Sequence, residues 1–151
     1  TYWQIAEKLY SSHPACLCFG TAGCESYEVG STTSGTATSP TITLPPDRFP
    51  RLRFDIATDI EPGVGGADPS TQKDWVFVEV LTGSEVTRIF DKLDMLPSTD
   101  TNLSWKSFEL SLEDFKGESA QIRFGFDTKD PNDNSHQGVY VDEVKVTLDC
   151  P

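Results

Sequence analysis

The sequence predicts an all-β fold, an antiparallel β-sandwich of two sheets. Seven or eight short segments are rich in β-branched and aromatic residues, and several alternate between apolar and polar side chains. Glycine, proline and polar turn residues separate them, and no segment keeps a convincing helical period over about 11 residues. At 151 residues the chain has the usual size of one domain, so we expect a single domain over 1–151.

In the first half, residues 2–9 fit either a helical turn or an N-terminal strand, and the choice stays open. Residues 36–44 are rich in threonine and end at Pro45-Pro46, which predicts a strand. Residues 51–58 alternate strictly and predict a half-buried strand whose inner face is Leu52, Phe54 and Ile56. Residues 61–73 contain prolines and glycines without an apolar period, and we expect a surface loop there.

The second half contains denser β-formers. Residues 75–81 and 86–90, joined by Thr82-Gly83-Ser84, predict a hairpin. Further strands are expected over 105–112, 120–126 and 138–148, with a short turn over 112–117 that glycine closes.

The charge balance excludes two classes of partner. Lys and Arg number 12 against 24 Asp and Glu, and the net charge of −12 repels nucleic acid and anionic lipid. No stretch approaches the roughly 20 apolar residues of a membrane span. The chain starts at Thr1 without methionine, so we expect a segment of a larger extracellular protein that has lost its signal peptide.

Four cysteines, an even number, predict two disulfides, no free thiol and an oxidising compartment. Cys16 and Cys18 are too close together for a common zinc motif, and the fourth cysteine is over a hundred residues away. On an extended segment these two would point to the same face, so each is expected to pair with Cys24 or Cys150. The connectivity stays open, although a bond to Cys150 would tie the C-terminal strand to the N-terminal region.

The sequence offers little for catalysis. The two histidines, His13 and His136, lie in no nucleophile motif, and we expect both to be exposed. A pair of carboxylates could hydrolyse glycosides, but no local motif singles out a pair among the 24 acids. The tryptophans could stack on sugars, although core packing is the expected role of Trp3, Trp75 and Trp105.

Acidic and amide residues gather in loops. One group spans 127–134 and includes Asp127 and Asp130, with Asp142 following; the other comprises Asp59, Glu61, Asp68 and Asp74. Calcium takes six to eight oxygen ligands from carboxylates, amides and carbonyls, which such loops can supply. The order does not fit a helix-loop-helix calcium loop, so a site would combine distant segments. A solvated acidic rim is the alternative.

The order of several short motifs resembles a known group. Tyr27-Glu28-Val29-Gly30, Leu52-Arg53-Phe54-Asp55, Phe126-Asp127-Thr128 and Gly138-Val139-Tyr140-Val141-Asp142-Glu143-Val144 follow one another as in MAM-like jelly-roll domains. These domains accompany immune inhibitor A metallopeptidases and form the cleaved adhesin domains of gingipains, all secreted bacterial proteins. The resemblance implies a jelly roll, and it implies that Asp142 helps to hold a structural calcium, with Glu61 and Asp74 at recurrent acidic positions.

Together these observations predict a non-catalytic extracellular module, secreted or at the cell surface, stabilised by structural calcium. Its partners would be a glycan or an extracellular protein, besides neighbouring domains of its parent chain, with no nucleic acid and no membrane insertion. The alternative is a structural spacer in a large surface protein without a ligand of its own. An independent hydrolase is the third and weakest hypothesis.

Overall fold

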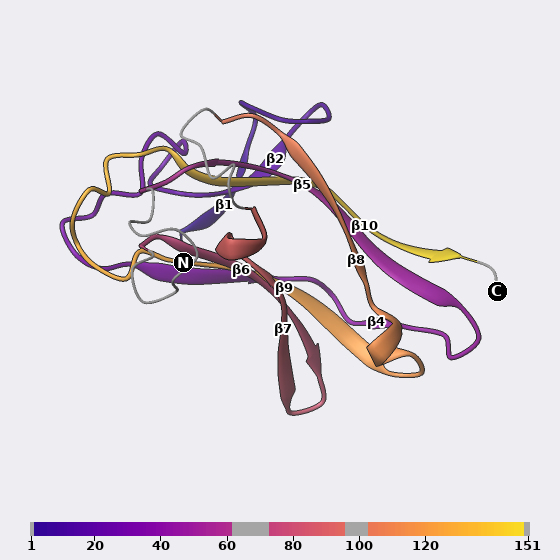
Figure 1. The fold of residues 1–151 in the computed structure, drawn as a ribbon. Helices are drawn as coiled ribbons and strands as arrows, with labels where there is room; N and C mark the ends of the chain where they lie inside the picture. The colour runs from indigo at the N-terminus through magenta and orange to yellow at the C-terminus, as the bar shows by residue number, and fades with distance from the viewer. Residues whose placement is uncertain (1, 62–72, 96–102, 150–151) are drawn as a thin grey trace.

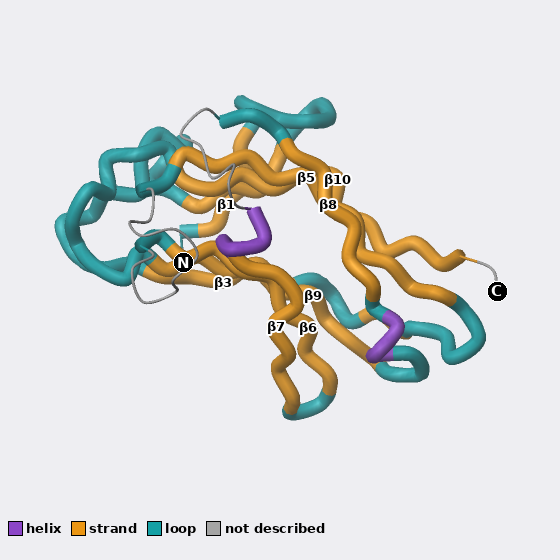
Figure 2. The backbone as a smooth tube through the Cα atoms, viewed as in Figure 1, coloured by secondary structure: helices purple, strands orange, loops and turns teal. Residues whose placement is uncertain are grey.

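The computed structural model describes residues 2–61, 73–95 and 103–149, which form two packed antiparallel sheets (Figures 1 and 2). The first sheet has the order β1-β2-β10-β5-β8, and its strands are β1 (Trp3–Ala6), β2 (Cys16–Phe19), β10 (Gly138–Asp149), β5 (Phe49–Asp59) and β8 (Lys106–Ser111). The second has the order β3-β9-β6-β7, with β4 also on β9; its strands are β3 (Ser34–Thr38), β9 (Ser119–Asp127), β6 (Trp75–Thr82), β7 (Glu85–Asp91) and β4 (Ile42–Thr43). Two 3₁₀ turns, η2 (Lys92–Met95) and η3 (Glu113–Phe115), complete the described elements.

This architecture confirms the predicted sandwich. The alternating residues Leu52, Phe54 and Ile56 of β5 are all buried between the sheets, as their period requires. The Phe54 ring packs edge-on against Phe124 of the second sheet, with ring centroids 5.4 Å apart. Aromatic contact across the two sheets therefore joins them into one core.

Several boundaries differ from the prediction. The strand expected over 36–44 is split into β3 and β4 around Pro40, which has no backbone N–H for a sheet ladder. The backbone N–H of Ser39 still donates to the Ile122 carbonyl oxygen, 2.8 Å away, so the chain stays beside β9 through the break. Residues 2–9 contain a strand, β1, and not a helical turn. Two elements, β2 and η2, were not predicted.

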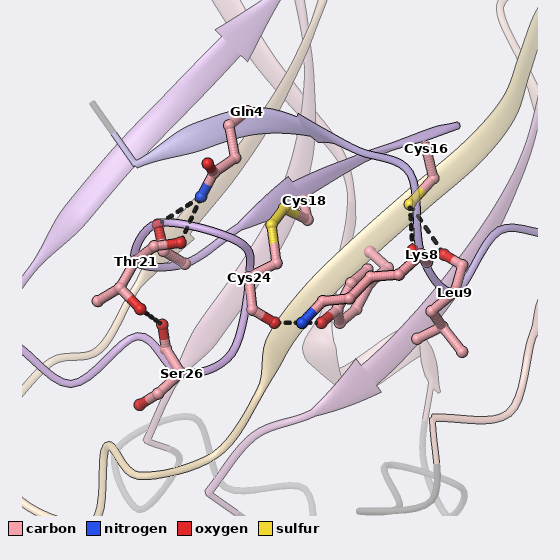
Figure 3. Close-up of a disulfide and its surroundings, with 10 residues drawn as sticks. Gln4, Lys8, Leu9, Cys16, Cys18, Thr21, Cys24 and Ser26 are labelled. Atoms are coloured by element: carbon pink, nitrogen blue, oxygen red, sulfur yellow. Dashed lines mark hydrogen bonds between the residues drawn. A yellow bond between two sulfur atoms is a disulfide. The ribbon is translucent and has the colours of Figure 1, made fainter. Parts of the chain in front are cut away.

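The structure contains one of the expected disulfides, Cys18–Cys24 (Figure 3). Cys16 is buried with a free thiol, which donates to the Leu9 carbonyl oxygen at 2.9 Å, so the prediction that no thiol is free is wrong for this residue. The thiol points away from Cys18 toward the turn after β1 (Figure 3). Cys150 lies outside the described residues, and its expected bond stays a prediction. No helix in the described part of the chain is long and apolar enough to span a membrane.

Candidate functional site

A buried carboxylate, Asp74, organises the end of the sandwich where β5 ends and β6 begins. Asp74 is fully buried, and its Oδ2 accepts hydrogen bonds from the Glu61 backbone N–H at 2.7 Å and from the Tyr27 hydroxyl. The Tyr27 side chain is itself fully buried. Burial opposes the charged form of Asp74 and raises its pKa to about 6, although the two hydrogen bonds work in the opposite direction.

A buried lysine lies beside this carboxylate. The Lys92 ammonium, on η2, donates to the carbonyl oxygens of Glu61, at 2.7 Å, and of Lys73. These two residues precede and follow residues 62–72 in the chain, so one cation holds both ends of that segment together. Burial lowers the Lys92 pKa to about 8, while the charges of Asp74 and Glu61 act to raise it.

The loop after β9 closes the same end of the fold. Thr128 accepts a hydrogen bond from the Asp74 backbone N–H at 3.4 Å, and Asp130 forms an ion pair with Lys73 at 2.7 Å. Asn134 is buried and donates through Nδ2 to the Asp130 carbonyl oxygen at 3.3 Å. The acidic loop predicted over 127–134 therefore lies against Asp74, although the two are far apart in the sequence.

Three buried side-chain oxygens here have no hydrogen-bond donor among the residues that the structure describes: Glu61 Oε2, Asp74 Oδ1 and Asn134 Oδ1. An unpaired buried polar atom costs free energy, and such atoms in folded proteins commonly face an ion or a water molecule. Carboxylate and amide oxygens are the ligands that calcium prefers. We call these three residues the orphan-oxygen cluster.

A hard cation at this cluster would need a mixed ligand set. Among the described residues, no three His, Cys, Asp or Glu side chains are grouped so that they could hold a metal. The Asn134 amide and backbone carbonyls would therefore have to complete the six to eight oxygens that calcium requires. Burial raises the Glu61 pKa, the nearby charges of Asp130 and Asp133 act in the same direction, and the charges of Lys73 and Lys92 oppose them.

Asp59 is close to this end but is already paired. Its Oδ1 lies 3.0 Å from His136 Nδ1, and its Oδ2 accepts from the Gln137 backbone N–H at 2.9 Å. The prediction that His136 is exposed is wrong, because this pairing and the Tyr27 ring, 6.5 Å away between centroids, partly bury the imidazole. His136 Nε2 lies 3.6 Å from Asp133 Oδ2 and forms no hydrogen bond with any described hydroxyl group, so no hydroxyl nucleophile is paired with it in the described structure. His13 is exposed, as expected.

Asp142 is not brought together with the orphan-oxygen cluster. On β10, Asp142 pairs with Asp55 of β5, whereas Gly138 pairs with Asp59. The strand from Gly138 to Asp142 therefore spans about 13 Å. The Asp142 carboxylate accepts from the backbone N–H groups of Ser12 and Glu143, each at 2.7 Å, and so anchors the segment between β1 and β2. Asp127 forms an ion pair with Lys129 at 2.6 Å. Asp68 lies outside the described residues.

A hollow of about 400 Å³ lies on the outer face of the first sheet, and its lining is both polar and apolar, with Phe54 and Phe108 among the apolar residues. It is lined by side chains of β5, β8 and β10, among them Arg53, Asp55, Ser107, Glu109, Glu143 and Lys145. None of the tryptophans lines it. Trp75 is buried as predicted, and Trp3 is half-buried with its indole N–H donating to the Gly35 carbonyl oxygen at 3.0 Å.

Two residues at this end of the sandwich, Tyr27 and Lys92, were not singled out by the sequence. Tyr27 was noted only as part of a family motif. Lys92 sits in the ordinary mixed run Phe90-Asp91-Lys92-Leu93, where nothing distinguishes it from a solvated lysine. Its burial is decided by the position of η2 over the loop ends, which no local pattern reveals.

No protein-family model matches the chain, and no curated protein matches it. Among solved structures, the K1 cleaved adhesin domain of Lys-gingipain from Porphyromonas gingivalis W83 is similar, with a TM-score of 0.54 and 14% identity over 96% of this chain and 82% of that one. A cyclase from Fischerella sp. TAU is also similar, with a TM-score of 0.51 and 15% identity over 99% of this chain and 69% of that one. At such identities these likenesses show a shared β-sandwich fold.

Proposed function

We propose that this chain is a non-catalytic extracellular binding module of the MAM-like type, stabilised by one calcium ion, with a glycan or an extracellular protein as its ligand. The observation that carries the calcium proposal is the orphan-oxygen cluster of Glu61, Asp74 and Asn134. The fold shared with a gingipain adhesin domain supports the binding role. Its neighbours would be further domains of a secreted parent protein.

The charges around the cluster support a divalent cation. Glu61, Asp74, Asp130 and Asp133 contribute four negative charges, and Lys73 and Lys92 contribute two positive ones, which leaves a formal charge of −2. A single calcium ion would neutralise this remainder and supply a partner for each unpaired oxygen. Glu61, Asp74 and Asn134 would hold it, and it would stabilise the folded state by mass action.

Thermal unfolding in excess calcium and in excess chelator tests the metal proposal. We expect a higher Tm in calcium, and Asp74→Asn should abolish the difference. Asp142→Asn is the matched control. It removes the same charge from a residue that the family resemblance favours as a calcium ligand but that does not lie with the orphan-oxygen cluster. A Tm that is equal in calcium and chelator, without heat of binding, would refute calcium stabilisation.

The ligand surface that we propose is the hollow on the outer face of β5, β8 and β10, which offers carboxylates, one guanidinium group, one ammonium group and a hydroxyl to a hydroxyl-rich ligand. A glycan array, followed by titration of any hit against Arg53→Ala and Ser107→Ala, tests it. Binding that these variants leave unchanged would place the ligand elsewhere. No binding to any glycan or extracellular protein would favour the structural spacer.

The competing enzymatic role rests on the similarity to a cyclase. The His136–Asp59 pair resembles part of a catalytic dyad, but His136 Nε2 is buried, forms no hydrogen bond among the described residues, and lies 3.6 Å from the Asp133 carboxylate. We therefore propose that this pair fixes the loop after Asp133 and has no catalytic role.

A further inference from the structure

The last strand of the first sheet has one side without a partner strand. β10 pairs with β5 from Gly138 to Asp149, but with β2 only through Val139, Tyr140 and Val141. From Glu143 to Asp149, no described strand therefore lies on its other side. Figure 1 shows this part of β10 running beyond β2 toward the C-terminus. We call residues 143–149 the open edge.

The open edge exposes apolar side chains. Val146 pairs with Leu52 and Leu148 with Pro50, both buried, so these positions face the inside of the sandwich. Nevertheless Val144 is 44% exposed and Leu148 46% exposed. Val144 also lines an apolar slot of about 230 Å³ with Leu17, Ala37, Thr38, Ser39, Ile122 and Phe124. A strand added here would bury apolar surface on its inner side.

We propose that the open edge binds the open edge of a second copy, so that two antiparallel β10 strands join the first sheets of two molecules into one. A twofold axis at Val146 would place Val146 opposite its own copy and would set each exposed Val144 opposite the exposed Leu148 of the other molecule. Open strand edges are known sites of such pairing.

The length of the open edge agrees with this arrangement. Val146 is its midpoint. The register of β10 against β5 shifts at a bulge between Asp142 and Lys145, where Glu143 has a φ of 52°, so a second strand centred on Val146 would pair regularly from Val144 to Leu148 and stop before β2 begins to cover β10. A shift toward the start of β10 would make the incoming strand collide with β2. A shift the other way would leave Val144 unpaired.

The charges on the outer face are compatible with the pairing. The twofold axis sets Glu143 opposite Asp149, which would repel if both were unpaired. Each carries its own cation, however, because Lys145 contacts Glu143, and Arg51 lies 3.0 Å from Asp149. The net charge of −12 on each copy still opposes association at long range.

Sedimentation over a range of concentrations, with reductant present so that Cys150 cannot link two copies, tests the proposal. We expect a concentration-dependent dimer that tightens between about 0.1 M and 1 M salt, because salt screens the net repulsion. Val144→Lys with Leu148→Lys should abolish the dimer. Ile5→Lys with Val86→Lys, at residues 70% and 51% exposed, makes the same charge change elsewhere and should preserve it.

Hydrogen exchange of the wild-type protein is a second test, and it does not depend on whether a variant folds. Amides of residues 143–149 that point away from β5 should exchange more slowly as the concentration rises. If the wild-type protein stays monomeric up to about 1 mM, the open edge does not bind a second copy, and the proposal is overturned. A dimer that persists in the Val144→Lys/Leu148→Lys variant would overturn it as well.

Discussion

The Lys92 ammonium donates a hydrogen bond to the Glu61 carbonyl oxygen at 2.7 Å while its side chain is completely buried. The same ammonium contacts the Lys73 carbonyl oxygen, so it joins the residue before 62–72 to the residue after it. A metal ion often connects loop ends in this way. Here a side chain of the protein does so, next to the oxygens that we propose as calcium ligands.

Replacing Lys92 with methionine should therefore destabilise the fold. The change keeps the apolar volume of the side chain but leaves two buried carbonyl oxygens without a charged donor, which costs about 2–3 kcal/mol. In a chain of this size that cost lowers the Tm by roughly 5–10 °C. Lys129→Met is the control, since this lysine contacts only its neighbour Asp127 through an exposed pair. A Lys92→Met protein as stable as the wild type would show that the Lys92 hydrogen bonds to Glu61 and Lys73 do not stabilise the fold.

The free energy of unfolding, measured in the presence of chelator, should increase as the pH falls from about 6 toward 4. The Asp74 pKa is raised from 3.8 to about 6 by burial, so the folded state binds a proton that the unfolded state does not bind in this window. The shift corresponds to a penalty on the order of 3 kcal/mol above pH 6 that disappears below pH 4. Asp74→Asn retains an acceptor without the charge and should flatten this part of the profile. Urea unfolding at closely spaced pH values measures it, and parallel profiles for both proteins would refute the assignment.

The Cys16 thiol should be unreactive in the folded protein. It is 3% exposed, and burial, with a smaller contribution from the Asp142 charge, raises its pKa to about 11. Little thiolate is therefore present at pH 8. In a Cys150→Ser variant kept unreduced, an aromatic disulfide reagent should find no thiol in the native protein and one in denaturant, since Cys18 and Cys24 are bonded. Rapid reaction of the native protein would contradict the burial of Cys16.

Gly125→Ala should be strongly destabilising. A Cβ atom at this position of β9 would lie 2.1 Å from the ring of Phe77 on the neighbouring strand, where the two residues pair directly. Overpacking of this kind costs about 1–3 kcal/mol or more. Phe77→Leu should recover part of the loss in the alanine background, and a double-mutant cycle measures this coupling. Additive effects of the two changes would show that the ring is free to move away.

Local sequence pattern was sufficient for most of the strands. In β5 and β9 apolar residues alternate with polar ones, because each strand turns one side to the core and the other to solvent. The pattern fails for β2, a short strand in which three of four residues are buried. It also fails for η2, because a single turn is too short to show a period.

The sequence by itself determined the fold class, the excess of acid and the loops that carry it, since these follow from composition and short-range periodicity. Only the tertiary structure decided which acids meet. Glu61 and Asp74 lie at the two ends of the connection between β5 and β6, and Asn134 lies in the loop after β9; they are at one end of the sandwich because β5, β6 and β9 have ends there. Asp142 is excluded because the rise of β10 carries it about 13 Å along the sheet. Lys92 is buried among them for the same reason: contacts between distant segments depend on how the sheets pack, and no local pattern records that.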